Sequence, residues 1–237
     1  MAKKRWKKKE RLERAAQPVS SEGGSNSKLV LAGVIVLILA GYFIFGSGGD
    51  NSLETPPPAD IAGKYMLFSD KASTHVQGRV ELIEFFDFTC AHCYAFHKDT
   101  WPVLKNKYGD KVELIDMGIP LRESSIPPLE AYEIAKDFGK GEEMKDALFT
   151  AFHEEDLDIT TVQILADIAE KIGLERDAFS DALSSRSKAS LVESNRRLAN
   201  SYKLTGTPTF VLDGNIKATG TSSDNLQAII DSILEGE

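Results

Sequence analysis

The feature that most constrains this chain is the stretch from Ile83 to His97, which holds both cysteines of the protein. An apolar, aromatic run leads into Cys90 and Cys93, and a helix-like pattern follows them. A strand that ends in Cys-x-x-Cys and passes into a helix is typical of a redox site. The first cysteine then lies at a helix N-terminus, where unpaired N–H groups and the helix dipole favour its thiolate. Cys90 is therefore the candidate nucleophile, and Cys93 is the thiol that closes a disulfide with it.

Two other uses of the cysteine pair fit the sequence less well. A structural disulfide across so short a loop would contribute little stabilisation. A structural zinc ion needs four ligands, and the chain has no second cysteine pair. Its histidines also lack a paired metal-binding spacing; they are His75, His92, His97 and His153. We therefore expect neither a metal nor another cofactor.

The overall charge of −8 hides a strong asymmetry along the chain. Residues 1–46 carry nine Lys or Arg against three Glu, which leaves residues 47–237 with a net charge of −14. A domain this acidic is a poor partner for nucleic acid, because phosphate contacts need a basic face. Residues 1–28 are basic and then rich in Ser, Gly and Asn, which predicts a disordered basic tail.

Residues 29–46 form an uncharged run of 18 residues, within the lower range for a transmembrane helix. Basic residues precede the run and the next one is Lys64, so the positive-inside rule predicts a cytoplasmic tail at 1–28. A cleavable signal peptide is the alternative, but it predicts a shorter apolar core and an Ala-x-Ala-like cleavage site. We therefore expect an uncleaved anchor, followed by a flexible linker rich in Gly, Ser and Pro at 47–60.

The folded domain is predicted to begin with a β-α-β unit. Val80–Phe88 is rich in strand-forming residues, and the stretch from Cys90 has helical spacing. We expect Pro102 to kink this helix and Gly109 to end it. A second strand is predicted over Lys111–Ile119. This order implies a parallel strand pair with a right-handed crossover.

Residues 124–203 are predicted to be entirely helical, and after them the pattern changes back to strands. The expected helices lie near 127–139, 141–153, 159–173, 175–184 and 186–203. Thr207–Leu212 and Ile216–Thr219 are then predicted to form a hairpin around Asp213-Gly214. A last helix is expected next, with Ser222 or Ser223 as its cap. The element order is thus β-α-β, a helical block, and β-β-α.

Four local motifs within this order resemble one known family. They are Glu84–Phe88 before the cysteines, Cys90–Tyr94 with the sequence Cys-Ala-His-Cys-Tyr, Pro120-Leu121, and Gly206–Phe210 with the sequence Gly-Thr-Pro-Thr-Phe. Together they resemble the DsbA-like group of the thioredoxin superfamily. The respective counterparts there are a Glu-Phe-Phe lead-in, a Cys-Pro-His-Cys-Tyr motif, a Pro-Leu that ends the second central strand, and a cis-proline loop. The resemblance covers roughly residues 62–236.

The resemblance implies an α/β, thioredoxin-like fold with an inserted all-helical domain, preceded here by one N-terminal transmembrane helix. The thioredoxin-like domain would comprise residues 61–123 and 204–237. The inserted domain would comprise residues 124–203.

The resemblance also implies roles for five residues around the cysteine motif and the proline loop. Cys90 and Cys93 would form the redox-active disulfide, and His92 would help to stabilise the thiolate, although an ordinary surface histidine is the alternative. Thr207 and a cis Pro208 would bind substrate beside Cys90.

In the family, an acid at the position of Glu84 lies beneath the active site and is thought to relay a proton for the buried cysteine. A buried carboxylate is costly, which supports such a role. The alternatives are that Asp87 performs it, or that Glu84 is an ordinary strand residue.

These features predict a single-pass membrane protein with its catalytic domain in the periplasm or on the outer face of the cell membrane. Its activity would be thiol–disulfide oxidation of exported proteins with free thiols. The resemblance to the DsbA-like group also implies a quinone-linked membrane protein as its redox partner. Isomerase, reductase and a tethered client-binding module remain alternatives. Ala91 stands where the family usually has proline, and Thr207 where its oxidases often have valine. Because of these two residues, the sequence leaves the redox direction open.

Overall fold

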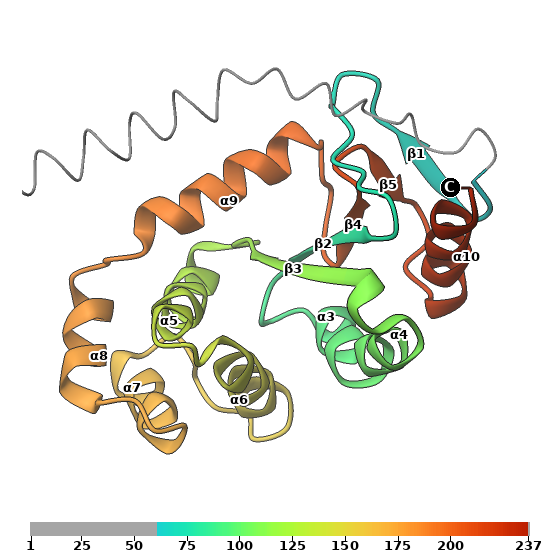
Figure 1. Cartoon of the computed structure of the whole chain (residues 1–237). Coiled ribbons are helices and arrows are strands. Elements are labelled where there is room, and N and C mark those ends of the chain that lie inside the picture. The colour runs from blue at the N-terminus through green and yellow to red at the C-terminus, as the bar shows by residue number, and fades with distance from the viewer. Residues whose placement is uncertain (1–60, 237) are drawn as a thin grey trace, which may run out of the picture. The chain divides into compact units, whose positions relative to one another are not determined.

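The computed structural model describes residues 61–236, which form a five-stranded sheet with helices on both faces (Figure 1). The strand order is β1-β5-β4-β2-β3. The strands are β1 Tyr65–Leu67, β2 Val80–Phe86, β3 Val112–Gly118, β4 Thr209–Leu212 and β5 Ile216–Ala218. Strands β2 and β3 are parallel, as predicted, and the other pairings are antiparallel. The edge strand β1 was not predicted, because three residues are too few for an alternating pattern to be recognised.

The crossover from β2 to β3 is a helix of three parts. It consists of α3 at Ala91–Ala95, a π-helical turn at Phe96–Thr100 and α4 at Trp101–Tyr108. Proline lacks an N–H to donate, so the chain widens to a π turn just before Pro102 and a new helix begins there. Gly109 ends α4 with a positive φ of 56°. The predicted helix end is confirmed, and the irregularity that was predicted at Pro102 as a kink takes the form of a π-helical turn just before it.

The remaining helices follow the predicted pattern closely. They are α5 Ile126–Asp137, α6 Gly141–His153, α7 Val162–Lys171, α8 Arg176–Ser184, α9 Ala189–Ser201 and α10 Ser223–Glu235. Short 3₁₀ turns occupy Gly109–Lys111 and Glu123–Ser125. The last helix begins with a side-chain cap, because the Ser222 hydroxyl accepts the N–H of Asn225.

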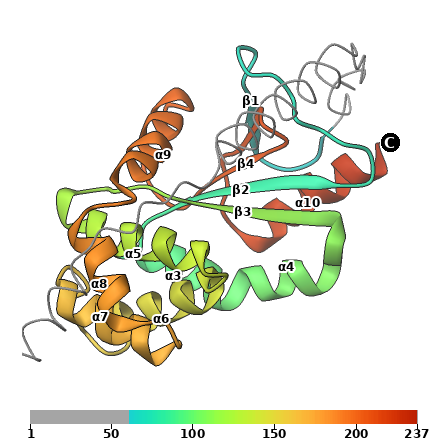
Figure 2. The ribbon, with the colours of Figure 1, turned by 60° about the vertical axis from the view of Figure 1, so that its left-hand side comes forward.

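Alternate side chains of β2 enter two different cores. Leu82 packs with residues of α4 and α10, whereas Ile83 and Phe85 pack with residues of α9. Figure 2 shows α3 and α4 on one side of β2 and β3, and α9 on the other. The central strand is therefore buried on both faces, and Glu84 points to the same side as Leu82, toward the crossover helix.

Helices α5–α8 form a third core that includes the end of β2. Phe86 and Phe88 pack into it with apolar side chains of all four helices. At Gly118, the last residue of β3, an added Cβ would lie 2.3 Å from Leu129 Cδ2, so glycine lets α5 approach the strand closely. The helical block thus shares its core with the sheet directly beside the cysteine motif.

The predicted tail at 1–28, membrane span at 29–46 and linker at 47–60 lie outside the described residues. Within 61–236, no helix is both long enough and apolar enough to cross a membrane.

Candidate active site

The turn between β2 and α3 is held by the buried carboxylate of Asp87. Its Oδ1 accepts the N–H and the hydroxyl of Thr89 at 2.8 and 2.7 Å. Its Oδ2 accepts the N–H of Leu121 at 2.9 Å. Asp87 therefore ties the cysteine turn to the loop after β3, and both of its oxygens are occupied by this structural role.

Cys90 is the N-cap of α3 and is only half-buried. Its Sγ accepts the N–H of Cys93 at 3.4 Å and, as a thiol, donates to the carbonyl of Thr207 at 3.3 Å. A hydrogen bond from the Cys93 side chain is the main reason that the pKa of Cys90 is lowered to about 5. The Thr207 side chain and the N–H groups of Cys93 and His92 act in the same direction, while burial opposes them.

Cys93 is fully buried and has the opposite character. Burial raises the pKa of its thiol far above the ordinary value, and the hydrogen bond to Cys90 and the charge of Glu84 raise it further. Both cysteines are free thiols here. Within residues 61–236, no three or more His, Cys, Asp or Glu side chains are grouped so that they could hold a metal ion. The site thus pairs a half-buried thiol of lowered pKa with a fully buried thiol of raised pKa.

The Thr207–Pro208 peptide bond is cis, as predicted, and lies beside Cys90 although 117 residues separate Cys90 from Thr207. The antiparallel pairing of β4 with β2 brings the two segments together. His92 is exposed, and its effect on Cys90 comes from its backbone N–H. The imidazole contribution expected from the sequence does not appear among the leading causes of the lowered Cys90 pKa.

Glu84 is fully buried and has a partner that the sequence did not predict. Lys145 of α6 lies 3.1 Å from Glu84 Oε2 and 2.6 Å from Asp116 Oδ1 of β3. The signal in the sequence was a lysine at an inward-facing position of α6, in spacing with Leu148 and Phe149. A strand carboxylate, a neighbouring strand carboxylate and a helix ammonium therefore form one buried cluster.

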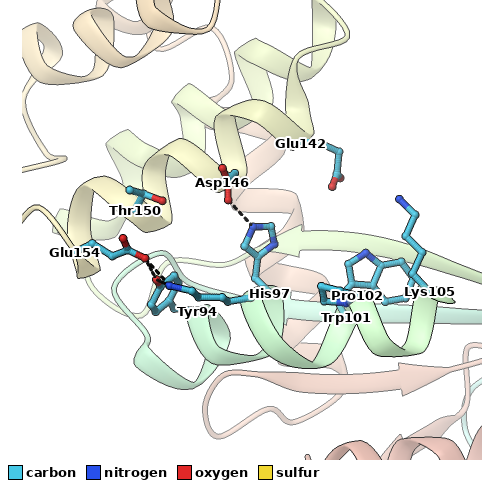
Figure 3. A pocket seen from close by; sticks show the side chains of 10 residues that line it. Tyr94, His97, Trp101, Pro102, Lys105, Glu142, Asp146, Thr150 and Glu154 are labelled. Atoms are coloured by element: carbon cyan, nitrogen blue, oxygen red, sulfur yellow. Dashed lines mark hydrogen bonds and ion pairs between the residues drawn. The ribbon is translucent and has the colours of Figure 1, made fainter. Parts of the chain in front are cut away.

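The crossover helix and α6 face each other across an open pocket of about 440 Å³ (Figure 3). Two polar contacts cross it. His97 Nε2 lies 3.5 Å from Asp146 Oδ1, and Lys98 forms an ion pair with Glu154 at 2.7 Å. Tyr94 also donates its hydroxyl hydrogen to Glu154. The pocket lining is completed by Trp101, Pro102, Lys105, Glu142 and Thr150. These contacts fasten the helical block to the helix that carries the cysteines.

His153, at the end of α6, makes a second connection between the helical block and the site. Its Nε2 lies 2.9 Å from the carbonyl oxygen of Phe88, and its ring stacks on Tyr94 at 4.7 Å. The carbonyl accepts, so Nε2 carries the hydrogen in this arrangement. The backbone just before the cysteines is thus anchored from both α6 and the loop after β3.

The lowered pKa of Cys90 gives an expected pH dependence. Because the thiolate is favoured in the fold, its contribution to the free energy of unfolding of the dithiol form is full above about pH 8.5, the ordinary thiol pKa. That contribution declines as the pH falls and is lost below about pH 5. We expect the rate of Cys90 alkylation to rise with a midpoint near pH 5, with Cys93 unreactive. A midpoint near pH 8.5 in the folded protein, as in the denatured control, would contradict this assignment.

Comparison with known proteins gives the class. The profile of a family described as thioredoxin matches residues 74–232, and the chain belongs to this thioredoxin family. Among curated relatives, the thiol:disulfide interchange protein DsbA of Burkholderia cepacia is 29% identical over 174 residues, which cover 73% of this chain and 81% of the relative. DsbA of Azotobacter vinelandii is 24% identical over 210 residues, covering 86% of this chain and 96% of the relative.

Solved structures agree on the fold. DsbA of Pseudomonas aeruginosa has a TM-score of 0.62 at 22% identity, covering 73% of this chain and 91% of that protein. The oxidoreductase DsbA of Xylella fastidiosa has a TM-score of 0.63 at 22% identity, covering 73% of this chain and 94% of that protein. The fold is therefore thioredoxin-like with a helical insertion. Within its family the chain is a DsbA-like protein thiol–disulfide oxidoreductase, as its motifs predicted.

Proposed function

We propose that this enzyme is a membrane-anchored, extracytoplasmic oxidase that forms disulfides in exported proteins through Cys90 and Cys93. The observation that carries the proposal is the contrast between an accessible Cys90 with a pKa lowered to about 5 and a buried Cys93 with a raised pKa. Stabilising the Cys90 thiolate stabilises the reduced pair, so the corresponding disulfide is a good oxidant.

The reaction proceeds by two thiol–disulfide exchanges. A client thiolate attacks Cys90 Sγ of the enzyme disulfide, the S–S bond breaks, and Cys93 leaves with the electron pair and takes up a proton. A second client thiolate then attacks the client sulfur of the mixed disulfide, and Cys90 leaves as a thiolate. The client loses two electrons and gains a disulfide, while the enzyme pair is reduced to the dithiol.

The segment at Thr207 and Pro208 is the proposed client-binding edge. Its nearness to Cys90, with the Thr207 carbonyl 3.3 Å from Sγ, supports this role. An extended client chain pairing with exposed backbone there would bring its own cysteine to Cys90. His92 is proposed to contribute through its N–H, and Glu84 to exchange the proton of Cys93.

A peptide with two cysteines tests the redox direction. The oxidised full-length protein should convert the reduced peptide to its disulfide form, with one peptide disulfide formed per enzyme disulfide consumed. The reverse outcome, in which the reduced protein opens the peptide disulfide and the equilibrium lies on that side, would contradict an oxidase and favour a reductase.

The proposed anchor is residues 29–46, on the grounds of their apolar length and the basic residues before them. The DsbA names of the curated relatives support action on disulfides, and the anchor would hold the site outside the cytoplasm. Re-oxidation is proposed to come from a quinone-linked membrane protein.

Topology is tested by labelling the cysteines, both of which belong to the site. A membrane-impermeant maleimide should label the reduced full-length protein in cells with a sealed inner membrane, and the protein should sediment with membranes. Labelling only after lysis would show that the site faces the cytoplasm, and recovery in the soluble fraction would show that the chain is not anchored.

A further inference from the structure

A buried cluster of three charged side chains lies on the face of the sheet that the crossover helix covers. Glu84 of β2 and Asp116 of β3 are direct neighbours in the parallel register, so both point to this face. Lys145 reaches both carboxylates from α6, at 3.1 and 2.6 Å. The side chains are only 0%, 7% and 1% exposed for Glu84, Asp116 and Lys145. Lys145 also lies over the Phe86 ring, at 4.7 Å from its centroid.

The charges of this cluster do not balance when every group is ionised. Two carboxylates face one ammonium in a largely buried site, and an uncompensated buried charge is costly. As a carboxylate, Glu84 also leaves Oε1 without a donor among residues 61–236. One bound proton would make the cluster neutral. Other titratable groups around it are Cys93 of α3, His97 of the π turn, and Tyr132 of α5, whose hydroxyl lies 3.5 Å from Asp116 Oδ2. Lys136 of α5 and Glu142 and Glu143 of α6 line a pocket together with Asp116.

We propose that Lys145 and Asp116 are positioning residues that set, in opposite directions, how tightly Glu84 holds the proton it exchanges with Cys93. The inference rests on the proposed function and assigns roles to two residues outside the cysteine motif. When the enzyme is being oxidised, the Glu84 carboxylate takes the proton of the Cys93 thiol. The Cys93 thiolate then attacks Cys90 Sγ of a mixed disulfide, the S–S bond to the substrate breaks, and the substrate thiolate leaves.

The electrostatics of the cluster support this division of roles. Burial raises the pKa of Glu84 to about 8, the charge of Lys145 lowers it, and the charge of Asp116 raises it. The Glu84 charge in turn raises the pKa of Cys93. Without Asp116, Glu84 should ionise at lower pH, so it should be able to accept the Cys93 proton at lower pH as well. Without Lys145, it should hold its proton to higher pH.

The test follows the reaction of the reduced full-length protein with excess oxidised glutathione, quenched with acid and resolved by mass. The Cys90 thiolate first forms a mixed disulfide and releases one glutathione, and the Cys93 attack then releases the second. In the wild type we expect the rate of the second step to rise with pH as Glu84 ionises. Glu84→Gln should remove this rise. Asp116→Asn should move the midpoint down, and Lys145→Met should move it up, each by roughly one pH unit or more.

Two surface variants are matched controls. Glu113→Gln changes an exposed carboxylate of β3 that pairs with Arg79, and Lys98→Met removes an exposed lysine that joins the crossover helix to α6. Both should keep the wild-type midpoint and the wild-type rate of the first step.

The outcomes separate this inference from the proposed function. Unchanged midpoints in Asp116→Asn and Lys145→Met, with a normal first step, would overturn the inference alone. Failure of wild-type Cys90 to form the mixed disulfide would overturn the proposed function and the inference with it. If Lys145→Met does not fold, the isosteric Asp116→Asn decides, because an unchanged or raised midpoint in that variant contradicts the assigned roles.

Discussion

Cys90→Ala should lower the rate of peptide oxidation by on the order of 10³-fold or more, as enzymes commonly do on losing their nucleophile. Cys90 is the half-buried sulfur of the pair and carries the lowered pKa, whereas Cys93 is fully buried. Removing it leaves no accessible cysteine sulfur among residues 61–236 for a client thiolate to react with. The measurement is the rate of disulfide formation in the two-cysteine peptide, at matched enzyme concentration.

The matched control for this variant is Cys93→Ala, which keeps Cys90 and its place at the start of α3. We expect this protein to react with oxidised glutathione and to stop at the mixed disulfide, because the second thiol is missing. A Cys90→Ala protein that still oxidises the peptide would contradict the catalytic assignment. Peptide binding that survives without oxidation would show that the Thr207–Pro208 edge also acts as a holding surface.

Phe86→Ala should cost about 3–5 kcal/mol of the free energy of unfolding, the range for truncating a large buried aromatic. Phe86 is completely buried at the end of β2. Its ring contacts those of Phe88, Tyr132 and Phe149, with centroids 5.1, 5.7 and 6.0 Å away. Phe86 therefore joins the sheet to α5 and α6 of the insertion. The cavity left by its removal would weaken the packing of both helices against the sheet.

Phe138→Ala is the matched control, because the same side chain is 62% exposed at the end of α5. Exposed substitutions of this kind change stability by no more than about 0.5 kcal/mol. Urea denaturation of both variants and the wild type, at equal pH and redox state, gives the comparison. Similar losses in the two variants would contradict the view that the insertion depends on the core around Phe86.

The fold was predictable from the sequence where the patterns were long and local. The apolar β2, the helical spacing after Cys90 and the capped last helix each carry their signal within a few residues. The edge strand β1 was missed because its three residues pair with β5, which lies about 150 residues further along the chain. Short antiparallel edges depend on such non-local pairing, which a local pattern does not contain.

In the active site, the residues that belong to short sequence motifs were predictable. Cys90, Cys93 and cis Pro208 follow from motifs, and the structure brings Cys90 and Thr207 together. The Lys145 cluster was not predicted. Lys145 stands at an inward-facing position of α6, but no motif connects it with its partners on β2 and β3. The role of Asp87 also emerges only from the structure, in which one of its oxygens binds the cysteine turn and the other binds the loop after β3.

The reduction potential of the Cys90–Cys93 pair tests the central claim most directly. Equilibration of the full-length protein with glutathione redox buffers at neutral pH gives the potential from the fraction oxidised. Because the Cys90 thiolate is stabilised and Cys93 is held as a thiol, we expect a value above about −180 mV, more oxidising than protein disulfide isomerase. A value near about −270 mV, that of thioredoxin, would contradict an oxidase and identify the pair as a reductant.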